Sequence, residues 1–294
     1  MISSKKYKTF EAGCTGASKL KKDIICQDFF MTDSNEGYAI AVVSDGLGSS
    51  PHFRSNVGSK FACEISIKVV KSFFKTLQEE LEENIDFKKM LKQLVSRIIY
   101  AWREQVKNHL KSTGLTEDEK EIYDTHYNDK DEEYKTKIYA ATFVLAVMSE
   151  KVSFVIQTGD SPCLVFDDEA CITPQETINP NCDMGFTTTL ADTEPLKGFM
   201  YYITQDMPKA IFVCSDGIRD SYTEKGFFNF GMVLLKEFEK NHDNALDYLK
   251  DYLPKLSEEG SADDMSIAGI YLEGYYDSDY KECYNRVMGK SKHR

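Results

Sequence analysis

The order of the predicted helices and strands limits the folds that this chain can adopt. Two long apolar stripes at helical spacing, at 55–81 and 87–110, follow a first strand signal, and a third stripe lies at 229–255. Helix and strand do not alternate, which disfavours a parallel doubly wound sheet and favours antiparallel sheets covered by paired helices. The predicted strands are short β-branched or aromatic runs at 38–44, 139–148, 152–158, 162–166, 209–214 and 266–272.

Composition narrows the classes of function. The 294 residues carry a formal net charge of −12, which argues against partners such as nucleic acid or an anionic membrane surface. The longest apolar run, 138–148, is too short to span a bilayer, and the first residues show no signal-peptide pattern. The eight cysteines include no Cys-x-x-Cys pair, so we expect reduced thiols in a cytoplasmic protein.

Two segments outside these elements are dominated by charge. Residues 112–137 hold a charged stretch without a clear period, which predicts a solvated loop inserted before the strand at 139. Residues 274–294 end on basic residues and predict a frayed tail. We therefore expect a single domain over 1–294, with this loop insertion and this tail.

Aspartates recur where predicted strands begin or end. Asp45 and Asp216 close two similar runs that end in Ser-Asp-Gly, and Asp160 closes a third run. Asp263 precedes the last strand, and Asp28 precedes a pair of phenylalanines. Buried carboxylates are costly unless they are hydrogen-bonded, paired or bound to a metal, and hard ions such as Mg²⁺ or Mn²⁺ take oxygen ligands. Each aspartate alone is better explained as a turn residue at a strand end, so the metal hypothesis rests on the whole set.

The order of these motifs resembles a known family, the metal-dependent serine/threonine protein phosphatases of type 2C, and especially its bacterial branch. The resemblance spans about residues 10–272 and implies an α+β fold, an αββα sandwich of two antiparallel sheets flanked by helices. The motifs that carry it are Cys-Gln-Asp (26–28), Ser-Asp-Gly (44–46), Thr-Gly-Asp-Ser (158–161), Ser-Asp-Gly-Ile-Arg-Asp (215–220) and Ser-Ala-Asp-Asp-Met-Ser (261–266).

The resemblance also implies roles for individual residues. Asp45 would bridge two ions, Mn²⁺ or Mg²⁺, and the carbonyl of Gly46 would bind one of them. Asp216 and Asp263 would complete the ligands of the second ion, and Asp160 would build a third, weaker site with Asp216. Asp28 would hold water on the metal. The catalytic residues implied are thus Asp28, Asp45, Asp216 and Asp263.

The function implied by the resemblance is hydrolysis of phosphoserine and phosphothreonine in proteins by a metal-activated water. Two ions can lower the pKa of water, orient it and screen the charge of the phosphoryl group. The expected partners are phosphorylated proteins, linked to a serine/threonine kinase, in the cytoplasm. The alternatives are a catalytically weak or inactive protein of this fold that binds phosphorylated partners, and a two-metal phosphodiesterase.

Some positions depart from the family pattern. Many members grip the phosphate with an arginine before the Gln-Asp motif, but no arginine precedes Arg54. Lys19 and Lys22 are the candidate substrate-binding cations in its place. Leu47 stands where some relatives have a histidine; His52 is a candidate to replace it, although a plain loop histidine is also consistent.

A further departure follows Asp263. The next residue is Asp264, where the family pattern has asparagine, so a second negative charge lies beside a predicted ligand. Two outcomes are open: the extra charge strengthens metal binding, or it is neutralised by a different partner.

Overall fold

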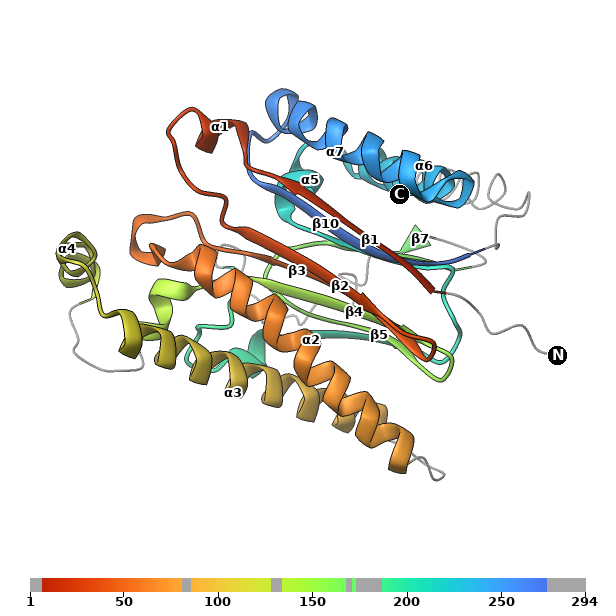
Figure 1. Cartoon of the computed structure of the whole chain (residues 1–294), viewed down its shortest axis with the longest axis horizontal. Helices are drawn as coiled ribbons and strands as arrows, with labels where there is room; N and C mark the ends of the chain where they lie inside the picture. The colour runs from red at the N-terminus through yellow and green to blue at the C-terminus, as the bar shows by residue number, and fades with distance from the viewer. Residues whose placement is uncertain (1–6, 81–85, 128–133, 168–170, 173–186, 274–294) are drawn as a thin grey trace, which may run out of the picture.

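The structure, a computed structural model, describes residues 7–80, 86–127, 134–167, 171–172 and 187–273. Its centre is a pair of five-stranded antiparallel sheets packed face to face (Figure 1). The first sheet has the order β1 (Tyr7–Cys14), β10 (Met265–Leu272), β9 (Ala210–Cys214), β6 (Cys163–Phe166), β7 (Cys171–Ile172). The second has the order β2 (Asp28–Ser34), β3 (Tyr38–Asp45), β4 (Phe143–Ser149), β5 (Ser153–Thr158), β8 (Met200–Thr204).

Long helices cover the outer face of each sheet (Figure 1). Helices α2 (Ser55–Glu80) and α3 (Phe87–Thr113) pack on the second sheet, and α6 (Glu224–Lys240) and α7 (His242–Glu259) on the first. The expected αββα sandwich is thus confirmed. The shorter helices are α1 (Ala17–Leu20), α4 (Glu117–His126), α5 (Asp216–Asp220) and the 3₁₀ turns η1 (Ser50–His52), η2 (Tyr134–Tyr139) and η4 (Pro195–Gly198).

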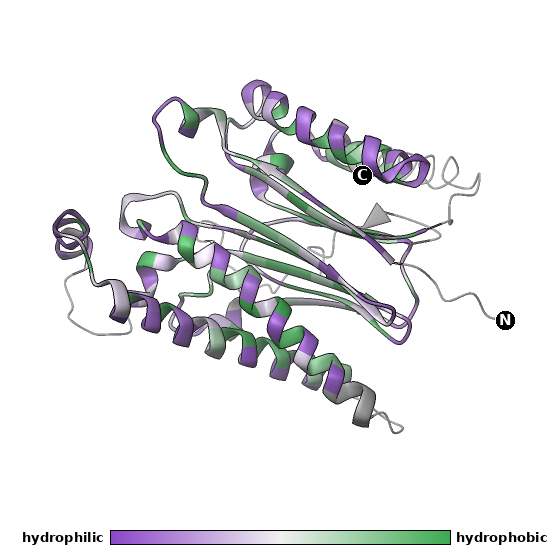
Figure 2. Cartoon of the chain, in the orientation of Figure 1, coloured by the Kyte–Doolittle hydropathy of each residue, from purple (hydrophilic) through white to green (hydrophobic). Residues whose placement is uncertain are grey.

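Alternation along the strands fills two separate layers of the core. In β3, Ala39, Ala41 and Val43 pack against the other sheet, whereas Ile40 and Val42 pack against α2 and α3. Because both faces are covered, the central strands are largely hydrophobic, while the long helices carry hydrophilic residues on their exposed sides (Figure 2). None of the helices in the described ranges has the length and apolar composition needed to cross a membrane.

The predicted elements are mostly confirmed, with corrections at their limits. The stripe predicted at 229–255 is two helices, because the chain breaks at Asn241, whose side chain accepts a hydrogen bond from the N–H of Asn244 and caps α7. The strand predicted at 139–148 begins only at Phe143, after the 3₁₀ turn that ends at Tyr139. Strands β1, β2, β7 and β8 were not predicted.

The charged loop predicted at 112–137 is wrong in part, since it contains helix α4. Thr116 and Glu119 form a capping box at its start: each side chain accepts a hydrogen bond from the backbone N–H of the other. Glu119 also pairs with Arg54, which fixes the helix to the rest of the molecule. The predicted tail, 274–294, lies outside the described residues.

Candidate functional site

Three of the predicted aspartates meet at one end of the sandwich. Asp28 begins β2 and lies directly opposite Asp45, the last residue of β3, in the antiparallel register. Asp216 is the first residue of α5 and follows β9, a strand of the other sheet. Asp45 lies within hydrogen-bonding reach of the side chains of both Asp28 and Asp216, so the cluster joins the two sheets.

Burial and the charges of neighbouring acids raise the pKa values of these three carboxyl groups. Burial raises the pKa of Asp45 well above its usual range, and the charges of Asp28 and Asp216 raise it further. Burial raises the pKa of Asp28 to about 7, against a hydrogen bond that the hydroxyl of Ser266 donates to its Oδ2 at 2.7 Å. The pKa of Asp216 is raised by burial and by the charges of Asp160 and others nearby.

Unpaired oxygen atoms in this cluster fit a hard cation. The Oδ1 atoms of Asp28 and Asp216 are buried, and no N–H or O–H group among the described residues donates to them. Such oxygens normally have a partner, and carboxylates that repel one another are the ligand chemistry of Mg²⁺ and Mn²⁺. In the same described ranges, no three His, Cys, Asp or Glu side chains already converge on one point, so the aspartates contact one another in pairs.

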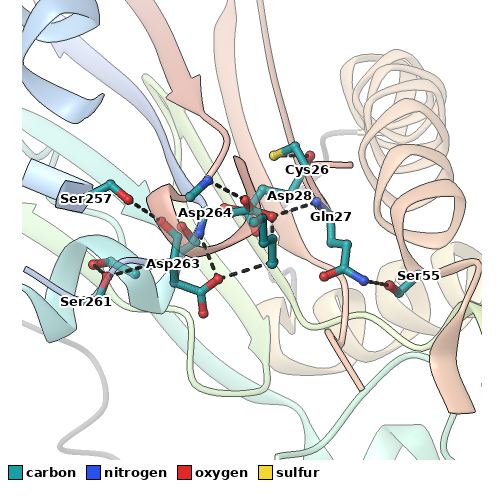
Figure 3. Close-up of polar contacts among 12 residues, drawn as sticks. Cys26, Gln27, Asp28, Ser55, Ser257, Ser261, Asp263 and Asp264 are labelled. Atoms are coloured by element: carbon teal, nitrogen blue, oxygen red, sulfur yellow. Dashed lines mark hydrogen bonds and ion pairs between the residues drawn. The ribbon is translucent and has the colours of Figure 1, made fainter. Parts of the chain in front are cut away.

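Asp263 and Asp264 lie in the turn before β10 and have different surroundings (Figure 3). The side chain of Asp263 is 49% exposed, and its Oδ1 lies 3.2 Å from Nζ of Lys19. Asp264 is buried and accepts hydrogen bonds at 2.7 Å from the N–H groups of Gly16 and Gln27 and from Nζ of Lys19. The additional charge at 264 is therefore neutralised by a lysine.

Lys19 forms ion pairs with both of these acids. Burial alone would lower its pKa, but the hydrogen bond to Asp264 and the charges of Asp263 and Asp264 raise it above the ordinary value. A charged ammonium group thus stands beside one predicted metal ligand. The side chain of Lys19, predicted to bind substrate, is engaged within the protein.

The glycines of the two Ser-Asp-Gly motifs allow close packing at the site. A Cβ on Gly46 would lie 2.8 Å from the carbonyl oxygen of Gln27, and a Cβ on Gly217 would overlap the carbonyl oxygen of Asp264. Side chains are therefore excluded at both positions by the neighbouring backbone. The same motif recurs because both strand ends approach another segment of chain.

The remaining predicted residues lie around this centre. Asp160 is exposed, follows Gly159 with a φ of 94°, and accepts a hydrogen bond from Thr187 at 2.9 Å. Nδ1 of His52 lies 2.7 Å from the carbonyl oxygen of Lys137, and burial lowers the pKa of this histidine. Lys22 is exposed in the segment before β2.

Arg54 is fully engaged in the packing of helices. Its guanidinium donates two hydrogen bonds to Glu119, at 2.7 and 2.6 Å, and others to Thr113, Gly114 and Tyr139. These contacts join the start of α2 to the end of α3 and to α4. Arg54 is therefore a structural residue and leaves the substrate-binding role to other groups.

Sequence reasoning missed the residues that support the acids. Ser266 donates a hydrogen bond to Asp28 from the neighbouring sheet, and Ser215, which accepts a hydrogen bond from the N–H of Ser266, acts to lower the pKa of Asp28. The only signal was that these serines belong to the motifs at 215–220 and 261–266. Their contacts depend on how the sheets pack.

Comparison with solved structures places this fold among bacterial phosphatases. A bacterial serine phosphatase is 17% identical, with 93% of this chain and 100% of that chain covered and a TM-score of 0.56. Serine/threonine phosphatase Stp1 from Staphylococcus aureus is 17% identical, with 93% and 98% covered and a TM-score of 0.56. RsbX in complex with magnesium is 11% identical, with 93% and 98% covered and a TM-score of 0.50. At these identities the likeness shows the fold.

The family follows from the sequence itself. A family model described as protein phosphatase 2C matches residues 15–254, so this chain belongs to the protein phosphatase 2C family. A search of curated proteins finds no match. Family and fold together support a protein phosphatase function.

Proposed function

We propose that this protein hydrolyses phosphoserine and phosphothreonine in proteins with the help of Mn²⁺ or Mg²⁺. The observation that carries the proposal is the buried cluster of Asp28, Asp45 and Asp216, whose pKa values are raised by burial and by the charges of neighbouring acids. Divalent ions would relieve this repulsion by neutralising the carboxylates. The family match and the magnesium in the related RsbX structure support the choice of metal.

The residues proposed to hold two ions are Asp45, the carbonyl of Gly46, Asp216 and Asp263. Asp263 now contacts Lys19, so its carboxylate would have to turn toward Asp216, whose pKa it already influences. A third and weaker site would use Asp160 with Asp216, since Asp160 is exposed and its charge also acts on Asp216.

Bound divalent ions would supply Lewis-acid activation of water and screening of the phosphoryl dianion. The residues of the chain would position the water and accept or donate its protons. Ser266 fixes Oδ2 of Asp28 and leaves Oδ1 without a donor. Burial raises the pKa of Asp28 to about 7 without metal, and bound divalent ions would lower it, so that the ionised carboxylate could accept a hydrogen bond from water.

Binding of the substrate phosphate requires a cationic or hydrogen-bonding group close to the aspartate cluster. Lys22 is exposed and His52 lies in η1, and both remain candidates for this role. Lys19 pairs with Asp263 and Asp264, and these two contacts use two of the three N–H donors of its ammonium group. We expect phosphorylated proteins as substrates, a serine/threonine kinase acting on the same proteins, and a cytoplasmic location.

A second candidate function is binding of phosphorylated partners without turnover. Two observations favour it: Arg54 is engaged by Glu119, and the aspartates in the described ranges meet in pairs. Such a protein would bind metal or phosphopeptide but would not release phosphate.

The two functions are separated by measuring phosphate release from a phosphothreonine peptide across a series of Mn²⁺ and Mg²⁺ concentrations. We expect turnover only with metal, and its loss in Asp45→Asn but not in the control Asp247→Asn, which alters an acid on the exposed side of α7. Metal binding by calorimetry without turnover would establish the second function. Full activity in excess chelator would refute the metal-dependent one.

A further inference from the structure

Residues 16–27, called here loop 16–27, form a surface loop whose two ends are fixed on one carboxylate. The N–H of Gly16 donates to Oδ1 of Asp264 and the N–H of Gln27 to Oδ2, both at 2.7 Å. Lys19, from within the loop, bonds the same Oδ2 at 2.7 Å. Because Asp28 follows the loop directly, the loop ends at the candidate active site, and Figure 3 shows its last residues, Cys26 and Gln27, beside Asp28 and Asp264. Compact loops with joined ends are often functional.

Hydrogen bonds of its own backbone order this loop. The N–H of Leu20 donates to the carbonyl of Gly16 at 2.9 Å, and the N–H of Ile24 to the carbonyl of Lys19 at 3.0 Å. Asp23 makes the turn with a φ of 55°. The loop thus holds its shape without burying its large apolar side chains.

Those apolar side chains are presented to solvent. Leu20, Ile24 and Ile25 are 65%, 44% and 67% exposed. The other large hydrophobic residues with comparable exposure in the described part of the chain lie one each on α3, η4, α6 and α7: Tyr100, Leu196, Val233 and Tyr248. Single exposed apolar residues are ordinary, whereas a cluster of them marks a surface that contacts something else.

The charge of the loop indicates what that partner carries. Lys21 and Lys22 are exposed beside the apolar side chains, and neither forms an ion pair with another described residue. The chain as a whole has a net charge of −12, so exposed cations in the loop that leads to Asp28 differ from its overall acidity. They complement a segment that brings a phosphoryl group to the site.

We propose that loop 16–27 is the docking surface for the substrate protein, in which Leu20, Ile24 and Ile25 contact large apolar side chains that flank the phosphorylated residue. Lys21 and Lys22 lie beside the negative charge of the same segment. This inference rests on the proposed function and adds to it a preference for substrate sequence. The anchoring on Asp264 keeps the docking surface at a constant position relative to Asp28.

The test compares two phosphothreonine peptides, one with leucines and one with serines around the phosphorylated residue. We expect the wild-type protein to favour the leucine peptide in kcat/KM by about tenfold or more, given the area that apolar side chains of this size can bury. In the double variant Leu20→Ser/Ile25→Ser this preference should fall to about one. Tyr100→Ser, which removes an equally exposed side chain (69%) from α3, is the matched control and should keep it.

The outcomes separate docking from catalysis. Equal rates for both peptides in the wild type, or a preference that survives the double variant, would overturn the docking proposal. If wild-type protein with Mn²⁺ hydrolyses neither peptide nor p-nitrophenyl phosphate, the proposed function fails. Fluorescence anisotropy with the labelled peptides then decides docking: tighter binding of the leucine peptide, lost in the double variant, supports it. Concentration-dependent dimers abolished by the double variant, without peptide selectivity, would assign the surface to a second copy.

Discussion

The contact between Lys19 and Asp264 is the structural feature most open to a quantitative test. Asp264 is 1% exposed at its side chain and Lys19 14%, and 245 residues separate them in the sequence. Replacing Asp264 by asparagine keeps one oxygen acceptor. It places an NH₂ group where the second carboxylate oxygen now accepts hydrogen bonds. Replacing Lys19 by methionine keeps most of the length of the unbranched side chain and removes the ammonium group.

The expected magnitude follows from the hydrogen bonds that each substitution removes. A hydrogen bond to a charged group contributes about 1.5–3 kcal/mol, and Asp264→Asn disrupts two such bonds. Because Asp263 still lies 3.2 Å from Lys19 and retains part of the pairing, we expect a loss of about 3 kcal/mol in the free energy of unfolding. Lys19→Met should cost about 2 kcal/mol, and the double variant should recover about 2 kcal/mol relative to the sum.

Urea unfolding of the four proteins in chelator measures these values, provided that the m-value stays constant. The exposed pair of Lys240 and Glu237 is the internal control: its atoms are also 2.7 Å apart, but the side chains are 53% and 40% exposed. Such a pair should couple by less than about 1 kcal/mol. If Lys19 and Asp264 coupled no more strongly than this exposed pair, the reasoning about the buried anchor would be refuted.

Further predictions concern the acids and Arg54. In chelator at pH 8, Asp45→Asn should raise the melting temperature by about 3 °C or more, because the substitution removes a carboxylate that its neighbours repel. Mn²⁺ should no longer stabilise this variant. Calorimetry with and without Mn²⁺ measures both effects. Burial raises the pKa of Glu239 to about 7 from 4.5, so the folded protein binds the extra proton and loses stability as pH rises through about 7. Glu239→Gln should therefore unfold at higher urea than wild type at pH 8 but not at pH 4, and equal pH profiles would contradict this. Arg54→Lys should lose about 2–4 kcal/mol of stability, because lysine cannot form the two parallel hydrogen bonds that Arg54 donates to Glu119. KM for the phosphothreonine peptide should change less than twofold. A large rise in KM would instead place Arg54 at the substrate.

The parts of the fold that could be predicted from sequence are those with a local signal. The run before Asp45 is apolar and β-branched and becomes β3, and the long stripes become α2 and α3. Strand β1 was missed because polar residues such as Lys8 and Glu11 interrupt its apolar positions. Helix α4 was missed because its charged sequence shows no apolar period, although the capping box at Thr116 was present in the sequence.

The positions of the site acids were a local property, since the aspartates stand at the ends of apolar runs whatever surrounds them. The residues that surround these acids in space could not be predicted in this way. That Asp28 lies opposite Asp45 is a matter of strand register, and that Asp216 joins them depends on how the two sheets face each other.

The sequence by itself thus determined which residues carry the charges, and through the ordered motifs it determined the family and the fold. Only the tertiary structure decided how each charge is satisfied: Asp264 by Lys19, Arg54 by Glu119, and Asp28 by a serine of the other sheet. The physical reason is that the energy of a buried charge is set by the few ångströms around it, and residues far apart in the chain supply those surroundings.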